Sequence, residues 1–163
     1  MDLEKVMQPL IDPAVLATFL VDAHRHTYAD KTAVKAPSSR LNSFDYRFER
    51  SGLVYRDTYF GRRDFVGEEI IYREAAPVWG MNYYGVVLAD DVPAGEVYDF
   101  LREALMQDCT GIEPARGPQF YNRDGWAYDN AVHGKLDDFS GLEAIRLGGR
   151  LVYRCRFHGG WVR

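Results

Sequence analysis

The sequence has few of the features by which many protein classes are recognised. It holds only two cysteines, Cys109 and Cys155, which are too few for a disulfide framework and are not spaced as metal ligands. No apolar run approaches the roughly 20 residues that a membrane span needs, and the first residues lack the basic start and apolar core of a signal peptide. These absences predict a cytoplasmic protein with reduced, structural thiols and no membrane association.

Familiar catalytic and cofactor motifs are also missing. The sequence has no glycine-rich phosphate loop, nucleophile elbow, HExxH motif or paired-cysteine motif. His24 and His26 lie two residues apart in an expected helix, so they cannot chelate a metal as an i, i+4 pair would. We therefore expect no cofactor and no metal site.

The charge balance disfavours one further class of partner. The net charge is -4, whereas affinity for a nucleic-acid backbone comes mostly from Lys and Arg. The basic stretch from His24 to Arg40 is expected to be a solvated helix end and loop. Direct binding of nucleic acid is therefore not expected.

The residues that are present predict a single α+β domain over 1–163. Helical spacing of apolar residues indicates helices over 13–27 and from 93 to about 109, and the polar stretch 28–42 is expected to be a mobile loop that acts as a lid. Alternating residues indicate seven strands, over 44–49, 53–60, 66–73, 78–88, 126–132, 139–147 and 151–157. Short connections favour antiparallel pairing, so the expected order is α-ββββ-α-βββ, with both helices packed on one face of a curved sheet. No internal repeat is evident.

Several charged residues fall on strand faces that are otherwise aromatic or apolar. Asp57 shares its face with Tyr55 and Tyr59, because residues two apart point to the same side of a sheet. Glu68 and Glu69 point to opposite sides, so whichever face of their strand is buried carries a carboxylate. Ionised groups are rarely buried without partners, and these carboxylates therefore need cations or solvent.

Three interpretations of this pattern remain open. The carboxylates belong to structural ion pairs or a solvated face, to an aromatic pocket with a few convergent polar groups, as in small-molecule sites, or to a protein interface. The aromatic share of 14% fits either a pocket or an interface.

Five sequence runs together resemble a known family. They are Tyr55 to Gly61, Phe65 to Glu69, Pro77 to Gly85, Arg116 to Pro118 and Phe157 to Gly160. In combination they resemble the bacterial domain of unknown function 5680, over nearly the whole chain from about Leu16 onward. The family has no established activity to carry over. Its members resemble stand-alone proteins or domains attached behind a helix-turn-helix segment, which implies an effector-sensing role. Here only one helix precedes the first strand, so a regulator role would require a separate partner.

These observations lead to one main hypothesis and two alternatives. The main hypothesis is a small-molecule-binding, effector-sensing or accessory domain with an aromatic, carboxylate-lined pocket. One alternative is a small acid-base enzyme in which a glutamate beside His158 is the general base, and the other is a homodimeric interaction module. The candidate site residues are Asp57, Glu68, Glu69, Asn82, Tyr83, Arg116, Glu143 and His158.

Overall fold

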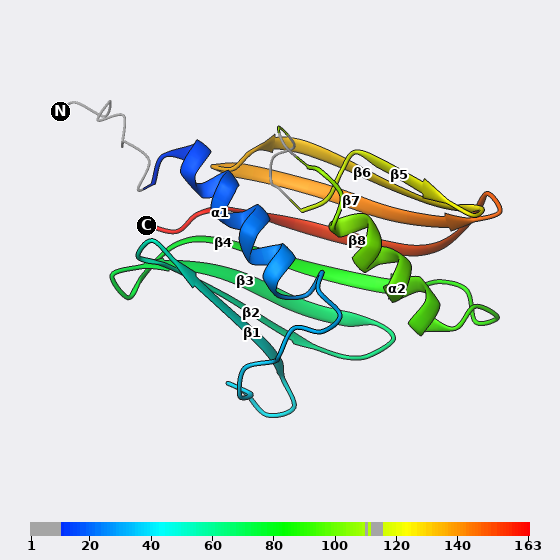
Figure 1. Cartoon of the computed structure of the whole chain (residues 1–163), viewed down its shortest axis with the longest axis horizontal. Coiled ribbons are helices and arrows are strands. Elements are labelled where there is room, and N and C mark those ends of the chain that lie inside the picture. Colours follow the sequence, from blue (N-terminus) through cyan, green and yellow to red (C-terminus); the bar gives the residue numbers. More distant parts are fainter. Residues whose placement is uncertain (1–10, 110, 112–115) are drawn as a thin grey trace.

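A computed structural model describes residues 11–109, 111 and 116–163; residues 113–115 of the turn-rich link after the second helix, and the first ten residues, lie outside that range. Within the described residues the chain forms two helices and eight strands (Figure 1). In chain order they are α1 (Pro13–His26), β1 (Phe44–Arg50), β2 (Leu53–Phe60), β3 (Phe65–Arg73), β4 (Ala76–Val87), α2 (Ala94–Leu105), β5 (Phe120–Arg123), β6 (Trp126–Lys135), β7 (Asp138–Leu147) and β8 (Arg150–Trp161).

Both helices begin and bury their side chains as their sequences predict. Asp12 caps α1 by accepting a hydrogen bond from the Ala14 amide at 2.8 Å, and Pro13 occupies the first turn, where its missing N–H costs nothing. Apolar residues three and four apart form one buried stripe on each helix. The stripes are Leu16, Phe19, Leu20 and Ala23 in α1, and Val97, Phe100, Leu101, Ala104 and Leu105 in α2.

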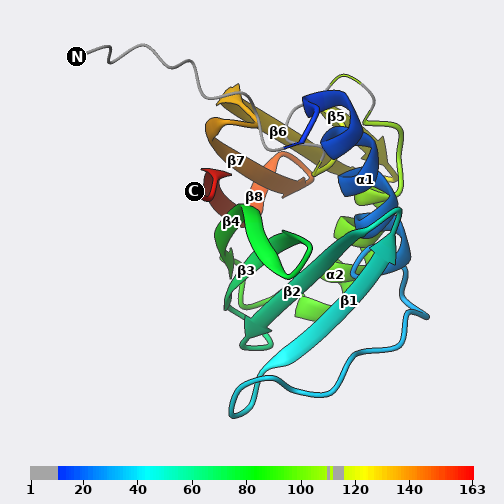
Figure 2. The same cartoon turned by 90° about the vertical axis from the view of Figure 1, so that its left-hand side faces the viewer.

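The strands form one antiparallel sheet in the order β1-β2-β3-β4-β8-β7-β6-β5. Both helices lie on the same face of this sheet (Figure 1), and the sheet curls around them (Figure 2). The prediction of an antiparallel α+β fold is thus confirmed. The core lies between the helices and the concave face, where Trp79, Tyr55 and Tyr153 are fully buried.

The predicted count of seven strands is wrong. The additional strand, β5, has four residues, and Phe120 is 67% exposed, so it is too short and too solvated to show a period of two. In β3, Ile71 points into the core and Ile70 lies on the outer face, where it is half-buried.

The chain consists of two α-ββββ halves, which the sequence analysis did not detect. The sheet order is symmetric about the β4–β8 pair, and Tyr83 lies opposite Phe157 at its centre. The pairings repeat between halves: Tyr59 lies opposite Gly67 in the first, as Val132 lies opposite Gly141 in the second. Even the register shift after Ile71 recurs after Ile145.

The repeated pairings reveal a weak sequence repeat. The pattern Phe-x-Gly-x-Glu-x-Ile occurs in β3 from Phe65 to Ile71 and again in β7 from Phe139 to Ile145. The buried helix residues Phe19, Leu20 and Ala23 likewise match Phe100, Leu101 and Ala104. Identities are scattered, and the link between helix and first strand differs in length between the halves, so only the strand pairing makes the equivalence plain.

Candidate ligand-binding site

A cavity of about 200 Å³ lies between the two helices and the concave face of β2, β3 and β4. Aromatic side chains form much of its wall, and its deepest polar residues are almost fully buried. Tyr28, Tyr59, Phe65 and Tyr98 line its walls, and its floor is formed by His24, Asp57, Glu69, Tyr83 and Arg116. An enclosed aromatic space with a few convergent polar groups is the usual composition of a small-molecule site.

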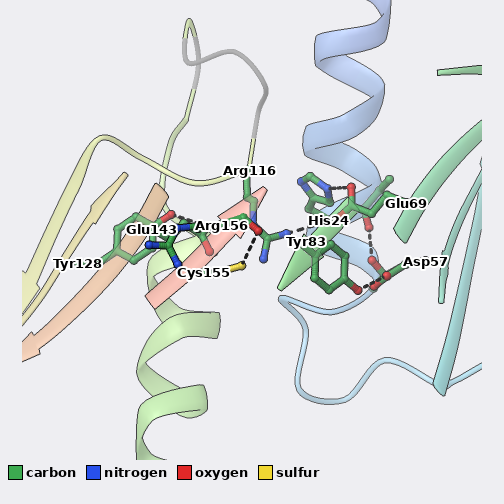
Figure 3. A network of polar contacts seen from close by, with 11 residues as sticks. His24, Asp57, Glu69, Tyr83, Arg116, Tyr128, Glu143, Cys155 and Arg156 are labelled. Carbon is green, nitrogen blue, oxygen red and sulfur yellow. Dashed lines mark hydrogen bonds and ion pairs between the residues drawn. The ribbon is translucent and has the colours of Figure 1, made fainter. Parts of the chain in front are cut away.

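Arg116 lies at the centre of the molecule and joins its two halves. Its guanidinium contacts Glu69 at 3.3 Å and Glu143 at 3.0 Å (Figure 3). It also lies over the rings of Tyr83 and Phe157. Burial opposes the charge on Arg116, but Glu143 and Glu69 outweigh that effect and raise its pKa further. Arg116 therefore neutralises two buried carboxylates from equivalent positions in the two halves.

Glu69 also contacts His24, which α1 delivers from its last turn. The His24 Nε2 and a Glu69 carboxylate oxygen are 2.8 Å apart. Burial disfavours the ionised carboxylate, but His24 and Arg116 together hold the pKa of Glu69 below its usual value. Glu69 is thus a charged carboxylate with cationic or hydrogen-bonding partners on both oxygens.

Asp57 has a different environment from Glu69. The Tyr83 hydroxyl donates a hydrogen bond to it at 2.5 Å, and Figure 3 shows its carboxyl group directed toward that of Glu69, which lies directly opposite on β3. Burial and the nearby Glu69 charge raise the pKa of Asp57 to about 7. Asp57 therefore gains and loses its proton near neutral pH.

Apart from Arg116, the polar residues of the floor all come from the first half of the repeat. Two equivalences come from strand pairing: Asn130 replaces Asp57 opposite a glutamate, and Phe157 replaces Tyr83. Leu105 stands on α2 where His24 stands on α1.

These replacements separate structural residues from candidate ligand contacts. A glutamate occupies the equivalent position in each half, as Glu69 in the first and Glu143 in the second. Both contact Arg116, so their presence has a structural explanation. The second half folds with Asn130 and Phe157 in place of Asp57 and Tyr83. The fold itself therefore does not require the acidic and hydroxyl groups of Asp57 and Tyr83.

The structure brings five of the predicted site residues together. Asp57, Glu69, Tyr83 and Arg116 line the cavity, and Glu143 is fully buried behind Arg116, where the Tyr128 hydroxyl donates a hydrogen bond to it at 2.8 Å.

The remaining three predicted residues lie on the outer face of the sheet. Glu68, Asn82 and His158 are consecutive neighbours across β3, β4 and β8, and Glu68 forms an ion pair with Arg40 at 2.7 Å. The expectation that His158 faces a cavity is wrong: Phe157 points inward and is buried, so His158 points outward and is exposed.

Sequence reasoning missed His24, Tyr59 and Arg102 as cavity residues. His24 continues the buried stripe of α1 one residue after Ala23, so its place on the apolar face was a readable signal. Tyr59 shares the strand face of Asp57 and could have been found by parity. Arg102 reaches the cavity from α2, and no local pattern indicates that contact.

Other features of the described residues bear on the class of protein. Cys109 and Cys155 are both free and buried, and burial raises the pKa of Cys155 to about 12. Neither described helix is long and apolar enough to cross a membrane.

The fold and the site together define an α+β domain whose curved antiparallel sheet encloses an aromatic cavity with an acidic floor. The chain belongs to the family of the domain of unknown function DUF5680, whose family model matches residues 57–162. That match extends from β2 to the end of β8 and begins later than Leu16. No curated protein and no solved structure gives a significant match to the chain.

Proposed function

We propose that this protein binds a small organic molecule in the cavity between its helices and sheet, as an effector-sensing or accessory domain. One observation carries the proposal: the first half of the repeat has Asp57 and Tyr83 at cavity positions where the second half has Asn130 and Phe157. Because the second half forms the same strands without them, the polar residues are not there to make the fold.

Energetics support the same proposal. Burying an ionisable carboxyl beside a second carboxylate is costly unless it has partners, and Asp57 keeps a pKa of about 7 in this position. An asparagine of nearly the same shape carries no charge, and Asn130 occupies the equivalent position in the other half. Ligand sites commonly retain such unfavourable groups because the ligand supplies the missing interactions.

The cavity suits a ligand with a single ring. Its volume of about 200 Å³ is somewhat larger than that of an apolar cavity of about 150 Å³ that binds benzene. Its wall has flat apolar surfaces, provided by the rings of Tyr59, Tyr98 and Phe65. Burial raises the pKa of Tyr59 and of Tyr98, so both hydroxyls stay protonated.

Binding can be tested on the purified protein without knowing the ligand. Native mass spectrometry should detect a copurifying small molecule, and a thermal-shift screen of single-ring compounds should raise the melting temperature. The double variant Asp57→Asn/Tyr83→Phe, which copies the second half, should lose both responses. Asn82→Ala on the outer face is the control and should keep them. A chain that copurifies with nothing and is stabilised by no single-ring compound would refute the proposal.

Acid-base catalysis is a second candidate, favoured by the pair Asp57 and Tyr83. A buried acid with a pKa of about 7, hydrogen-bonded to a tyrosine, is suited to proton transfer at neutral pH. The His24–Glu69 contact would hold the neighbouring charge in place. Incubating the protein with a compound identified by the screen, and following its mass and proton exchange by NMR, distinguishes an enzyme from a binding domain: Asp57→Asn should abolish any exchange.

A further inference from the structure

The opening of the cavity carries two cations without acidic partners. Lys35 and Arg62 line the cavity and are exposed, and each lies 5.3 Å from the centre of the Phe44 ring. Neither forms an ion pair with any residue in the described part of the chain.

Cations that neighbour these two residues in the chain are paired. Lys31, in the same link as Lys35, contacts Asp99 at 2.8 Å, and Arg63, next to Arg62, contacts Asp90 at 2.7 Å. Unpaired positive charge is therefore concentrated at the opening, held in place by an aromatic ring. This arrangement favours an anionic group near Phe44.

The carboxyl groups of the cavity lie at its floor. Asp57 and Glu69 are both buried there. Glu69 contacts Arg116, whereas no cation among the described residues lies within hydrogen-bond distance of Asp57. In its ionised form Asp57 accepts hydrogen bonds only, so the floor then favours a donor such as an amino or hydroxyl group.

The walls between opening and floor are aromatic. Tyr28, Tyr59, Phe65 and Tyr98 surround the space, and Arg102 lies over the Tyr28 ring at 4.8 Å. Aromatic walls favour a flat ring by stacking and edge contacts.

We infer that the ligand is a small aromatic acid, with its acidic group held at the opening by Lys35 and Arg62, its ring between the tyrosines, and an amino or hydroxyl donor at Asp57. This inference rests on the proposed function, since it names the class of molecule that the same cavity takes.

The test compares single-ring probes by isothermal titration calorimetry with the full chain. Two probes, 4-aminobenzoate and 4-aminophenylpropanoate, carry both an acidic group and an amino donor, separated by different lengths. Benzoate lacks the donor, and aniline lacks the acid. At least one of 4-aminobenzoate and 4-aminophenylpropanoate should bind about tenfold more tightly than both benzoate and aniline. A tenfold difference in affinity corresponds to roughly 1.4 kcal/mol, the contribution of one good polar contact.

Variants at the opening separate charge from shape. Lys35→Gln/Arg62→Gln should weaken binding of the acidic probes about tenfold and leave aniline unaffected, and raising the salt concentration should have the same effect on the unmodified protein. Lys31→Gln, which removes a neighbouring paired charge, is the matched control and should change nothing.

The outcomes distinguish this inference from the function on which it rests. The aromatic-acid class would be overturned if aniline bound as tightly as 4-aminobenzoate and 4-aminophenylpropanoate. It would also be overturned if Lys35→Gln/Arg62→Gln left the affinity for the acidic probes unchanged. In both cases the cavity would still bind small molecules. No binding by any probe, together with a native mass spectrum that shows a different copurified molecule, would also overturn the class alone. No probe binding and no copurified molecule would overturn both.

Discussion

Asp57 and Asn130 occupy equivalent positions in the two halves of the chain, and each lies directly opposite a buried glutamate on the neighbouring strand. One position carries an ionisable group on the cavity wall, and the other carries its neutral counterpart away from the cavity. The pair places an ionisable carboxyl and a neutral amide at the same position of the same strand arrangement.

The substitution Asp57→Asn should change how stability depends on pH. The folded protein holds the Asp57 proton up to a pKa of about 7, whereas an unfolded chain releases it near 3.8. The folded state therefore binds more protons in this window, and stability falls as pH rises from about 4 to 7. Urea unfolding at pH 5 and pH 8 should show this loss, of about 2 to 4 kcal/mol, in the natural chain and a much smaller one in Asp57→Asn.

A matched variant identifies the source of that pH dependence. Asp45 is also buried, but hydrogen bonds from Ser39, Ser43 and Thr58 outweigh the effect of burial and lower its pKa. Asp45→Asn should therefore destabilise the chain about equally at pH 5 and pH 8, and less only below about pH 4, so it should not reproduce the change between pH 5 and pH 8 expected for Asp57. The same pH profile for both variants would contradict the assignment to Asp57.

Replacement of Arg116 by methionine should be strongly destabilising. It leaves Glu69 and Glu143 buried without their shared cation, and removing one partner of a buried ion pair costs about 3 to 5 kcal/mol. The loss should be smaller at pH 5, where the carboxylates can take up protons. Arg123→Met is the control, because its pairs with Glu103 and Asp124 are exposed and should contribute less than about 1 kcal/mol. Equal stabilities of the two variants in chemical denaturation would argue against a central role for Arg116.

Truncation of Phe100 to alanine tests the packing of α2. The side chain is 1% exposed and contacts the rings of Tyr121 and Trp126. Its loss should lower the free energy of unfolding by about 3 to 5 kcal/mol, and Phe19→Ala at the equivalent position of α1 should act similarly. A thermal melt of Phe100→Ala indistinguishable from that of the natural chain would be inconsistent with the observed packing.

His158→Ala should have little effect on stability or on ligand binding. The side chain is exposed on the outer face of the sheet, on the side opposite to the cavity. Surface substitutions of this kind usually change stability by less than about 0.5 kcal/mol. Calorimetry that shows lost ligand binding in this variant would place a site on the outer face instead.

The elements of the fold followed from the sequence where a local pattern was long enough. Phe19, Leu20, Phe100 and Leu101 repeat at helical spacing, and they are buried because a helix has only one face to turn toward the sheet. The short links between β1 and β4 required antiparallel pairing for the same local reason. By contrast, β5 is too short to show a period.

The sequence by itself determined which residues share a strand face, so Asp57 and Tyr59 were grouped correctly and one of Glu68 and Glu69 had to be buried. Tertiary structure alone decided that Glu69 is the buried one and that His158 faces outward, because a period of two does not say which side the helices cover. Tertiary structure alone also placed Arg116 between Glu69 and Glu143. Contacts between residues so far apart in the chain depend on how the two halves of the sheet join at β4 and β8, and no local pattern encodes that pairing.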